Sequence, residues 1–453
     1  MSKVQQLAVI AGLSCGVLAA QGVRVEGSDP VTIGRVGTGI AFGRSLEAAG
    51  LNPALLVTLQ DPTVAHLALG AELQAQSATP LNNQLRTFSD DRNRSLTAFG
   101  FAQRLAPNLA WGLKLDQPFA RHLELRATGT SRFLGDQISL DSHRAEAQLG
   151  WSPAGRPEWS FGFGLGLTRL AFELGSMVRA DIPVDPSQPV SSGNPVQGLA
   201  EVGLREKGSK VVPSWSLGAR WALASRWTLA ATVEAPLKGA MDLSAGFKSS
   251  YLRTYDNDGF SVAALGTDAR AQALVAGSSV KAGQGDLSLP ARATVGVRQR
   301  VNQLFTWELD VTWMGAGLRV PTFASMITPS GAVQAPAALP SGKASTTAKL
   351  GGEFTLGKAW TLRLGLSLDS GYRAAGDVEP LLGGASQSAF SVGAGYRVWG
   401  GELSAGYQYR LDRDTDRLGL DGTWSASGFR SVATKTRVEG AGHLLAVGFR
   451  RSF

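Results

Sequence analysis

A strict alternation of apolar and polar residues in several short segments constrains the fold of this chain most. In Trp360–Asp369 the even positions hold only Trp and Leu, and the odd positions hold Thr, Arg, Gly, Ser and Asp. The same period of two occurs in Phe305–Trp313 and in Trp159–Arg169. Successive side chains of a β-strand point to opposite faces, so one face of each segment meets an apolar medium and the other a polar or crowded one.

The composition places these strands in a membrane. Only 18% of the 453 residues are charged, 56 are Gly, and the mean hydropathy is close to zero. A helical membrane protein needs apolar runs of about 18 or more residues, and none is present beyond the N-terminus. We therefore predict an all-β fold, a transmembrane antiparallel β-barrel of about 14 strands.

The predicted strands are separated by alternating short and long connections. The strands are predicted at 64–76, 95–104, 109–118, 136–151, 159–173, 211–222, 226–237, 287–300, 305–318, 343–356, 360–370, 387–398, 401–410 and 440–453. A barrel with both termini on the periplasmic side has short turns there and long outer loops. The long loops are predicted at 77–94, 119–135, 174–210, 238–286, 319–342, 371–386 and 411–439.

The N-terminus is typical of a secreted protein. Residues 1–20 have a positive Lys3, an apolar stretch and a small-residue end, which predicts a signal peptide cleaved before Gln21. The one cysteine, Cys15, lies inside it, so the mature chain is predicted to have no thiol chemistry. Residues 21–63 are predicted to form a plug, or hatch, and residues 64–453 the barrel.

The hatch prediction depends on Gly34–Asp61, which is too apolar for a disordered tail. Pro53 prevents a long helix from passing through it. Its "GxGxA…A…NPALL" pattern resembles the N-terminal hatch of the FadL family of outer-membrane transporters for long-chain fatty acids and hydrocarbons. The resemblance implies that substrate binding or gating involves the hatch residues Phe42, Asn52, Pro53, Ala54 and Leu55.

The resemblance extends over most of the chain. Leu109–Ala120 resembles the third strand of the family, and Leu287–Trp313 resembles its "LPxxxxxGxxxR…W…D" hairpin. It implies passive uptake of a hydrophobic cargo, movement of the hatch, and sideways exit at a kink near Leu109–Pro118. The sequence itself shows Gly112 and Pro118 there but no clear bulge.

Several residues have structural or binding interpretations. The inward-facing glycines Gly162, Gly164 and Gly166 leave room for the hatch or for cargo, or let the wall bend. Phe453 ends an alternating strand and resembles the assembly signal read by the barrel assembly machinery. Charged residues predicted to face inward are Lys114, Asp116, Glu234, Arg292, Arg298, Glu308, Asp310, Arg363, Arg397 and Arg410. We interpret them chiefly as ion pairs between plug and wall, and alternatively as the lining of a polar pathway.

The remaining chemistry is sparse. The four histidines have no metal-ligand spacing, and His66 and His443 are predicted to be polar residues of the lumen. We expect no cofactor, no metal and no enzyme activity, although a triad assembled in space stays open. The formal charge of +8 comes from scattered Lys and Arg, which favours contact with outer-membrane lipid and lipopolysaccharide over nucleic acid.

Three functions remain. The first is hatch-gated transport of hydrophobic molecules. The second is a water-filled porin for small polar solutes, and the third is a barrel without transport that acts as an adhesin or scaffold. Loops 261–280 and 319–342 are rich in apolar and small residues, which favours the first function, because a loop bathed in water has little need for them.

Overall fold

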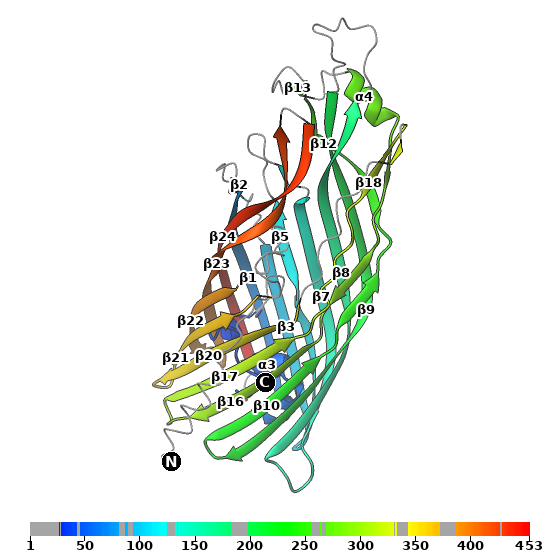
Figure 1. Ribbon diagram of the computed structural model, residues 1–453. Helices are drawn as coiled ribbons and strands as arrows, with labels where there is room; N and C mark the ends of the chain where they lie inside the picture. The colour runs from blue at the N-terminus through cyan, green and yellow to red at the C-terminus, as the bar shows by residue number, and fades with distance from the viewer. Residues whose placement is uncertain are drawn as a thin grey trace, which may run out of the picture.

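The chain forms a closed antiparallel β-barrel (Figure 1). The computed structural model describes residues 27, 29–42, 46–80, 87–88, 94–124, 132–133, 135–182, 198–255, 263–264, 269–329, 331–332, 343–371, 386–425 and 428–453. In these residues 14 strands close the wall, when β4 and β5 are taken as one interrupted strand. The predicted fold class is confirmed. The predicted signal peptide lies outside the described residues.

The wall strands follow one another around the barrel in chain order. They are β1 (Thr63–Pro80), β3 (Arg94–Ala106), β4 (Leu109–Asp116), β5 (Ala120–Glu124), β7 (Gly135–Trp151), β8 (Trp159–Ile182), β9 (Gly198–Ala224), β10 (Trp227–Glu234), β16 (Arg292–Arg300), β17 (Phe305–Met314), β20 (Ser345–Leu356), β21 (Trp360–Asp369), β22 (Gln387–Val398), β23 (Gly401–Ser425) and β24 (Gly428–Ser452). The barrel closes where β1 pairs with β24, with Val64 opposite Ser452. This pairing removes both free edges of the sheet.

Smaller elements lie between the wall strands. They are β2 (Thr87–Phe88), β6 (Arg132–Phe133), β11 (Leu237–Ala240), β12 (Ser244–Tyr255), β13 (Ala263–Ala264), α4 (Ala269–Ala276), β14 (Ser279–Lys281), β15 (Asp286–Leu289), β18 (Ser325–Thr328) and β19 (Gly331–Ala332). Helix α4 lies at the end of the barrel that the longest strands reach (Figure 1). No helix in the described part of the chain is long and apolar enough to cross a membrane.

The short turns share one rim of the barrel. Neighbouring turns are joined by backbone hydrogen bonds, for example from Ser152 to Asn108 at 2.9 Å and from Arg300 to Arg226 at 2.8 Å. Aromatic rings gather near this rim, and the rings of Trp159 and Trp221 stack 4.8 Å apart. The predicted alternation of short and long connections is therefore present in the fold.

The two faces of the wall differ as the alternation predicts. Along β21, the exposed positions are the apolar ones, such as Leu366 at 55%, and the buried positions are polar, such as Arg363 at 3%. The wall thus presents Leu and Trp outward and encloses its charges. Outward apolar side chains can contact lipid without an opposing protein layer.

Several strands are longer than the sequence predicts. Strands β8 and β9 continue into the predicted loop 174–210, and β23 and β24 continue into 411–439. Polar residues of these extensions, such as Arg205 and Lys207, point outward and are exposed. A strand that has left the bilayer is no longer required to be apolar outside, so the alternation that identifies strands disappears there.

The N-terminal segment consists of three short helices. They are α2 (Pro30–Ile33), α3 (Leu46–Leu51) and the 3₁₀-helix η1 (Pro53–Thr58). Asp29 caps α2 by accepting from the amides of Val31 and Thr32 at 3.0 and 2.9 Å. Pro53 starts η1, where its missing donor costs nothing. Residues 30–33, 46–49 and 53–56 are buried, and α3 is seen inside the barrel wall (Figure 1).

Candidate functional site

The third strand of the wall is interrupted. Strand β4 ends at Asp116 and β5 begins at Ala120, and both pair with β7. Strand β3 follows β4 only as far as Phe99, opposite Leu115. Among the described residues β5 pairs with β7 alone, so the hydrogen bonding of the wall is broken between β3 and β5. We call this place the strand break.

Local hydrogen bonds hold the strand break. Pro118 has no amide hydrogen to donate to a neighbouring strand. The Oγ atom of Ser142 on β7 accepts from the Phe119 amide at 2.8 Å and donates to the Phe119 carbonyl at 2.6 Å. Gln117 Nε2 lies 3.3 Å from His143 Nδ1. The strand break is therefore held by side chains of the next strand.

A cavity lies inside the barrel beside the strand break. Ala98 and Phe99 of β3, residues 113–118 and the N-terminal segment line it. Its wall is strongly charged: Arg144 donates to both Asp116 oxygens at 2.8 and 2.7 Å. Lys114 Nζ donates to the carbonyl of Gly50 at 2.7 Å. The floor of the cavity thus combines charged wall residues with the N-terminal segment.

An apolar cluster lies on the side of the strand break away from the charged cavity. It comprises Phe119, Leu123, Ile138, Leu140, Leu170, Phe172, Leu174, Val212, Leu237, Met241, Leu287, Leu289, Met314, Leu318 and Phe323. We call it the first apolar cluster. Phe119, which stands within the strand break itself, is one of its members. A second apolar cluster is formed by Val178, Ala180, Val202, Leu204, Leu274, Ala324 and Met326. It includes Leu274 of α4 and continues toward the long-loop end.

The polarity of the lumen inverts along β8. Up to Thr168 the inward residues are Ser, Gly and Thr, whereas Leu170, Phe172 and Leu174 follow on the same face and are buried. Over the same stretch the outward residues become polar, as at Arg169 and Glu173. The lumen is therefore polar at membrane level and apolar above it. This inversion is visible in the sequence and predicts the cluster, which the alternation of the other strands does not reveal.

Asn52 joins the N-terminal segment to itself and to the wall. Its side chain is fully buried. It accepts from the Ala54 amide at 3.0 Å and donates to the carbonyls of Ile40 at 2.8 Å and of Ala219 on β9 at 3.3 Å. One side chain therefore fixes the turn, the preceding loop and the wall together.

Glycines of the wall make room for this turn. Gly150 stands opposite Gly162, and Gly162 opposite Gly218, in a row across β7, β8 and β9. A Cβ atom on Gly162 would meet the carbonyl carbon of Pro53 at 2.2 Å. A larger residue at Gly150 or Gly162 would collide with the backbone of the segment, and one at Gly218 with the side chain of Asn52.

The other predicted inward glycines have different neighbours. A Cβ atom on Gly164 would meet the carboxylate of Glu146 at 2.4 Å, and one on Gly166 would meet the carbonyl oxygen of Ala145 at 2.3 Å. Gly164 and Gly166 thus leave room for residues of the neighbouring strand β7, whereas Gly162 leaves room for the N-terminal segment.

Acidic residues of β17 bind the loop between α2 and α3. Glu308 accepts from the Ala41 amide at 2.8 Å, and Asp310 accepts from the Gly39 amide at 3.1 Å. Both carboxylates are buried. These contacts agree with the interpretation of inward charges as links between plug and wall, but here the partners are backbone amides rather than cations.

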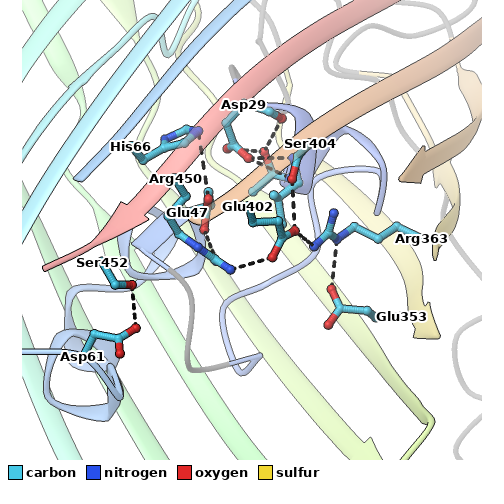
Figure 2. A network of polar contacts seen from close by, with 12 residues as sticks. Asp29, Glu47, Asp61, His66, Glu353, Arg363, Glu402, Ser404, Arg450 and Ser452 are labelled. Carbon is cyan, nitrogen blue, oxygen red and sulfur yellow. Dashed lines mark hydrogen bonds and ion pairs between the residues drawn. The ribbon is translucent and has the colours of Figure 1, made fainter. Parts of the chain in front are cut away.

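A chain of ion pairs connects α3 to the wall (Figure 2). Arg450 on β24 donates to Glu47 of α3 at 3.0 Å and to Glu402 at 2.7 Å. Glu402 accepts from Arg363 at 2.6 Å, and Arg363 donates to Glu353 at 2.9 Å. Burial opposes the ionisation of Glu47, but the attraction of Arg450, and then of His66, outweighs it and lowers the pKa of Glu47 to about 2.

The remaining residues that the resemblance assigns to a hatch lie in apolar or aromatic contacts. Phe42 stacks under the guanidinium of Arg35, 3.9 Å from its ring centre. Ala54 and Leu55 are fully buried, and Leu55 packs in a cluster with Val64 of β1 and Ala102 of β3. Phe42 also belongs to this cluster, at its charged border.

Phe453 and the histidines lie as follows. The Phe453 ring is 65% exposed, and its amide donates to the Thr63 carbonyl at 2.9 Å across the closing seam. His66 faces inward and is buried beside Glu47, as predicted. His443 was predicted inward but lies on the outward face beside Tyr407, 2.9 Å from its hydroxyl. His443 has the same parity as the exposed Leu445 and Val447, so the alternation along the strand predicts an outward side chain.

The barrel, its lipid-facing girdle and its filled lumen define the class of integral outer-membrane proteins. The sequence matches, over residues 20–453, the family described as "Outer membrane protein transport protein (OMPP1/FadL/TodX)", and the chain belongs to this family. The predicted resemblance and the outer-membrane localisation are confirmed. The chain is accordingly a transport protein and not an enzyme.

Solved structures share the fold. A Pseudomonas aeruginosa FadL homologue matches with a TM-score of 0.68 at 15% identity, covering 97% of this chain and 100% of its own. The Pseudomonas putida toluene transporter TodX matches with a TM-score of 0.60 at 16% identity, covering 94% and 99%. The Ralstonia pickettii toluene transporter TbuX matches with a TM-score of 0.55 at 13% identity, covering 94% and 99%. No curated protein matches the sequence significantly.

Proposed function

We propose that the chain lets hydrophobic small molecules, either long-chain fatty acids or aromatic hydrocarbons, diffuse passively through the outer membrane. The cargo enters among the outer loops, passes through the two apolar clusters and leaves sideways at the strand break. Residues 21–63 act as the hatch that closes the polar lumen below. The named cargoes of TodX and TbuX, which share the fold, support a hydrophobic substrate.

The observation that carries this proposal is the double position of Phe119. It lies in the strand break and in the first apolar cluster at once. A molecule moving through that cluster reaches the break before it reaches the charged residues below. Entry into the charged lumen would desolvate Lys114, Asp116 and Arg144, which costs free energy, whereas the bilayer outside is apolar.

A bulky side chain at the strand break, on the wall of the cavity beside it, tests the proposal. Ala98 of β3 lines this cavity and is 7% exposed. We expect Ala98→Trp to lower uptake of labelled oleate and toluene at least several-fold in cells that lack other members of the family. Ala145→Trp places the same ring on the exposed outer face of β7 and should leave uptake unchanged. Equal uptake by both variants, at equal protein level, would contradict exit through the break.

A further inference from the structure

Glu206 is a buried carboxylate between the two apolar clusters. It lies on β9, opposite Leu174 of the first cluster and one inward position from Leu204 of the second. Only 1% of its surface is exposed. Its neighbours Arg205 and Lys207 point outward, so this part of β9 has already left the bilayer.

One oxygen of Glu206 is occupied and the other is free. The amide of Gly283 donates to Oε2 at 3.0 Å. The Oε1 atom is buried and has no hydrogen-bond partner among the described residues. No cation of the described part of the chain forms an ion pair with Glu206 in this structure. A buried acceptor without a donor is destabilising, so such a group calls for a ligand that can donate to it.

The surroundings place this oxygen between the two apolar clusters, on the path proposed above for the cargo. Thr322 lies against Gly283, where an added Cβ atom would meet its carbonyl oxygen at 2.0 Å. The next residues along the chain are Phe323 of the first apolar cluster and Ala324 of the second. Glu206 and Gly283 therefore stand where one cluster passes into the other.

We propose that Glu206, oriented by the Gly283 amide, is a polar subsite that takes the hydroxyl group of an otherwise apolar cargo molecule. This inference rests on the proposed transport function. A hydroxyl group donates to Oε1 and needs little desolvation. An ammonium group would have to give up far more hydration in an apolar passage. An ionised carboxylate is repelled and offers no donor.

The wild-type protein provides the first test. Burial raises the pKa of Glu206 to about 7, so uptake is measured at about pH 8.5, where the carboxylate form dominates and only accepts. The probes are hexadecanol, hexadecyl methyl ether, which has no donor, and hexadecane. We expect the concentration of hexadecanol that halves the uptake of labelled hexadecane to be about tenfold lower than that of the ether, as one charge-assisted hydrogen bond implies. Equal competition would overturn the subsite.

Two variants give the second test. Glu206→Leu should abolish the preference for the alcohol and leave hexadecane uptake intact. Glu206→Gln replaces an acceptor by an amide that can donate, so uptake of hexadecanol should fall while uptake of hexadecanoate rises. Two opposite changes would not arise from a general packing defect. Glu173→Gln alters an outward carboxylate on the neighbouring strand and should change neither.

The outcomes separate the two proposals. Persistent hexadecane uptake without any preference for hexadecanol would reject the subsite and keep the transport function. Uptake of oleate and of toluene by wild-type cells no greater than in cells without the protein would reject the transport function itself. If Glu206→Leu reduces uptake of all probes, the subsite is judged on the wild-type protein alone, by whether hexadecanol competes more strongly than the ether.

Discussion

A Cβ atom on Gly162 would lie 2.2 Å from the backbone nitrogen of Ala54, so the barrel wall and the N-terminal segment meet backbone to backbone. No side chain can yield at this contact. The row of Gly150, Gly162 and Gly218 therefore has a steric function at one defined place, the turn that begins with Asn52 and Pro53.

The first prediction is that Gly162→Ala displaces the N-terminal segment. Overpacking of this kind costs about 1–3 kcal/mol, which falls on the docking of the segment because the strand pairing of β8 is untouched. We expect membrane-inserted, heat-modifiable protein with increased conductance in planar bilayers. Gly246→Ala is the control, because a Cβ atom there has nothing within 4 Å. A conductance equal to that of the control would contradict the prediction.

The second prediction concerns Asn52. Asn52→Ala combined with Pro53→Ala removes the side chain that contacts Ile40, Ala54 and Ala219. Each polar group left unpaired costs about 1–3 kcal/mol, so we expect uptake of oleate or toluene to fall more than the protein level does.

A matched control for this variant exists in a short turn. Asn302 also accepts from nearby amides, those of Leu304 and Phe305, but it is exposed to water. Asn302→Ala should therefore leave uptake unchanged. Uptake by the Asn52 variant at the level of this control would show that the turn has no part in transport.

The third prediction concerns the ion pair of Glu47 and Arg450. Because the folded pKa of Glu47 is lowered to about 2, its stabilising effect is fully present above its unfolded pKa of about 4.5 and is lost as the pH falls toward 2. Because the pair holds the segment in place over this range, the conductance of the wild-type protein should stay low from neutral pH to about pH 4.5. Glu47→Gln should raise the conductance over that whole range. The control is Glu158→Gln, which alters a carboxylate in a short turn with 34% of its side chain exposed and should conduct as the wild type does. If Glu47→Gln conducts no more than this control, the ion pair does not hold the segment in place.

The fourth prediction concerns assembly. Deletion of Phe453, or Phe453→Asp, removes an exposed terminal aromatic at the closing seam of β1 and β24. We expect less heat-modifiable, membrane-inserted protein. Leu304→Asp alters a similarly exposed apolar residue in a short turn at the same rim, 57% exposed, and should assemble normally. Normal insertion of the Phe453 variants would remove its assignment as an assembly signal.

The sequence predicts the wall well and the lumen poorly, for a physical reason. The bilayer requires an apolar residue at every second position, so the alternation in segments such as Trp360–Asp369 predicts a membrane strand. Pro118 marks the end of a strand, but whether the wall opens there depends on how far β3 follows β4, which is a long-range pairing. The partners Glu47 and Arg450 stand 403 residues apart, and nothing in the local sequence joins them.

The last prediction concerns the whole N-terminal segment. Within 34–56, the buried Ala54, Leu55 and Leu56 are 0% exposed, and burial of apolar surface stabilises by about 25 cal/mol per Å². The wall contributes its own closing pairs between β1 and β24, which do not involve the segment.

Deleting residues 34–56 should therefore leave an assembled barrel whose polar lumen is open, with increased leakage of small polar solutes. Arg450 then keeps Glu402 as its partner, and the amides that Glu308 and Asp310 bind are replaced by water. The measurement is conductance in bilayers together with uptake of toluene and oleate in cells. Toluene and oleate uptake should fall relative to the wild type, because the deletion removes Leu46, Gly50 and Leu51 from the lining of the cavity beside the break. Unchanged conductance together with unchanged uptake would show that the segment neither closes the lumen nor guides the cargo.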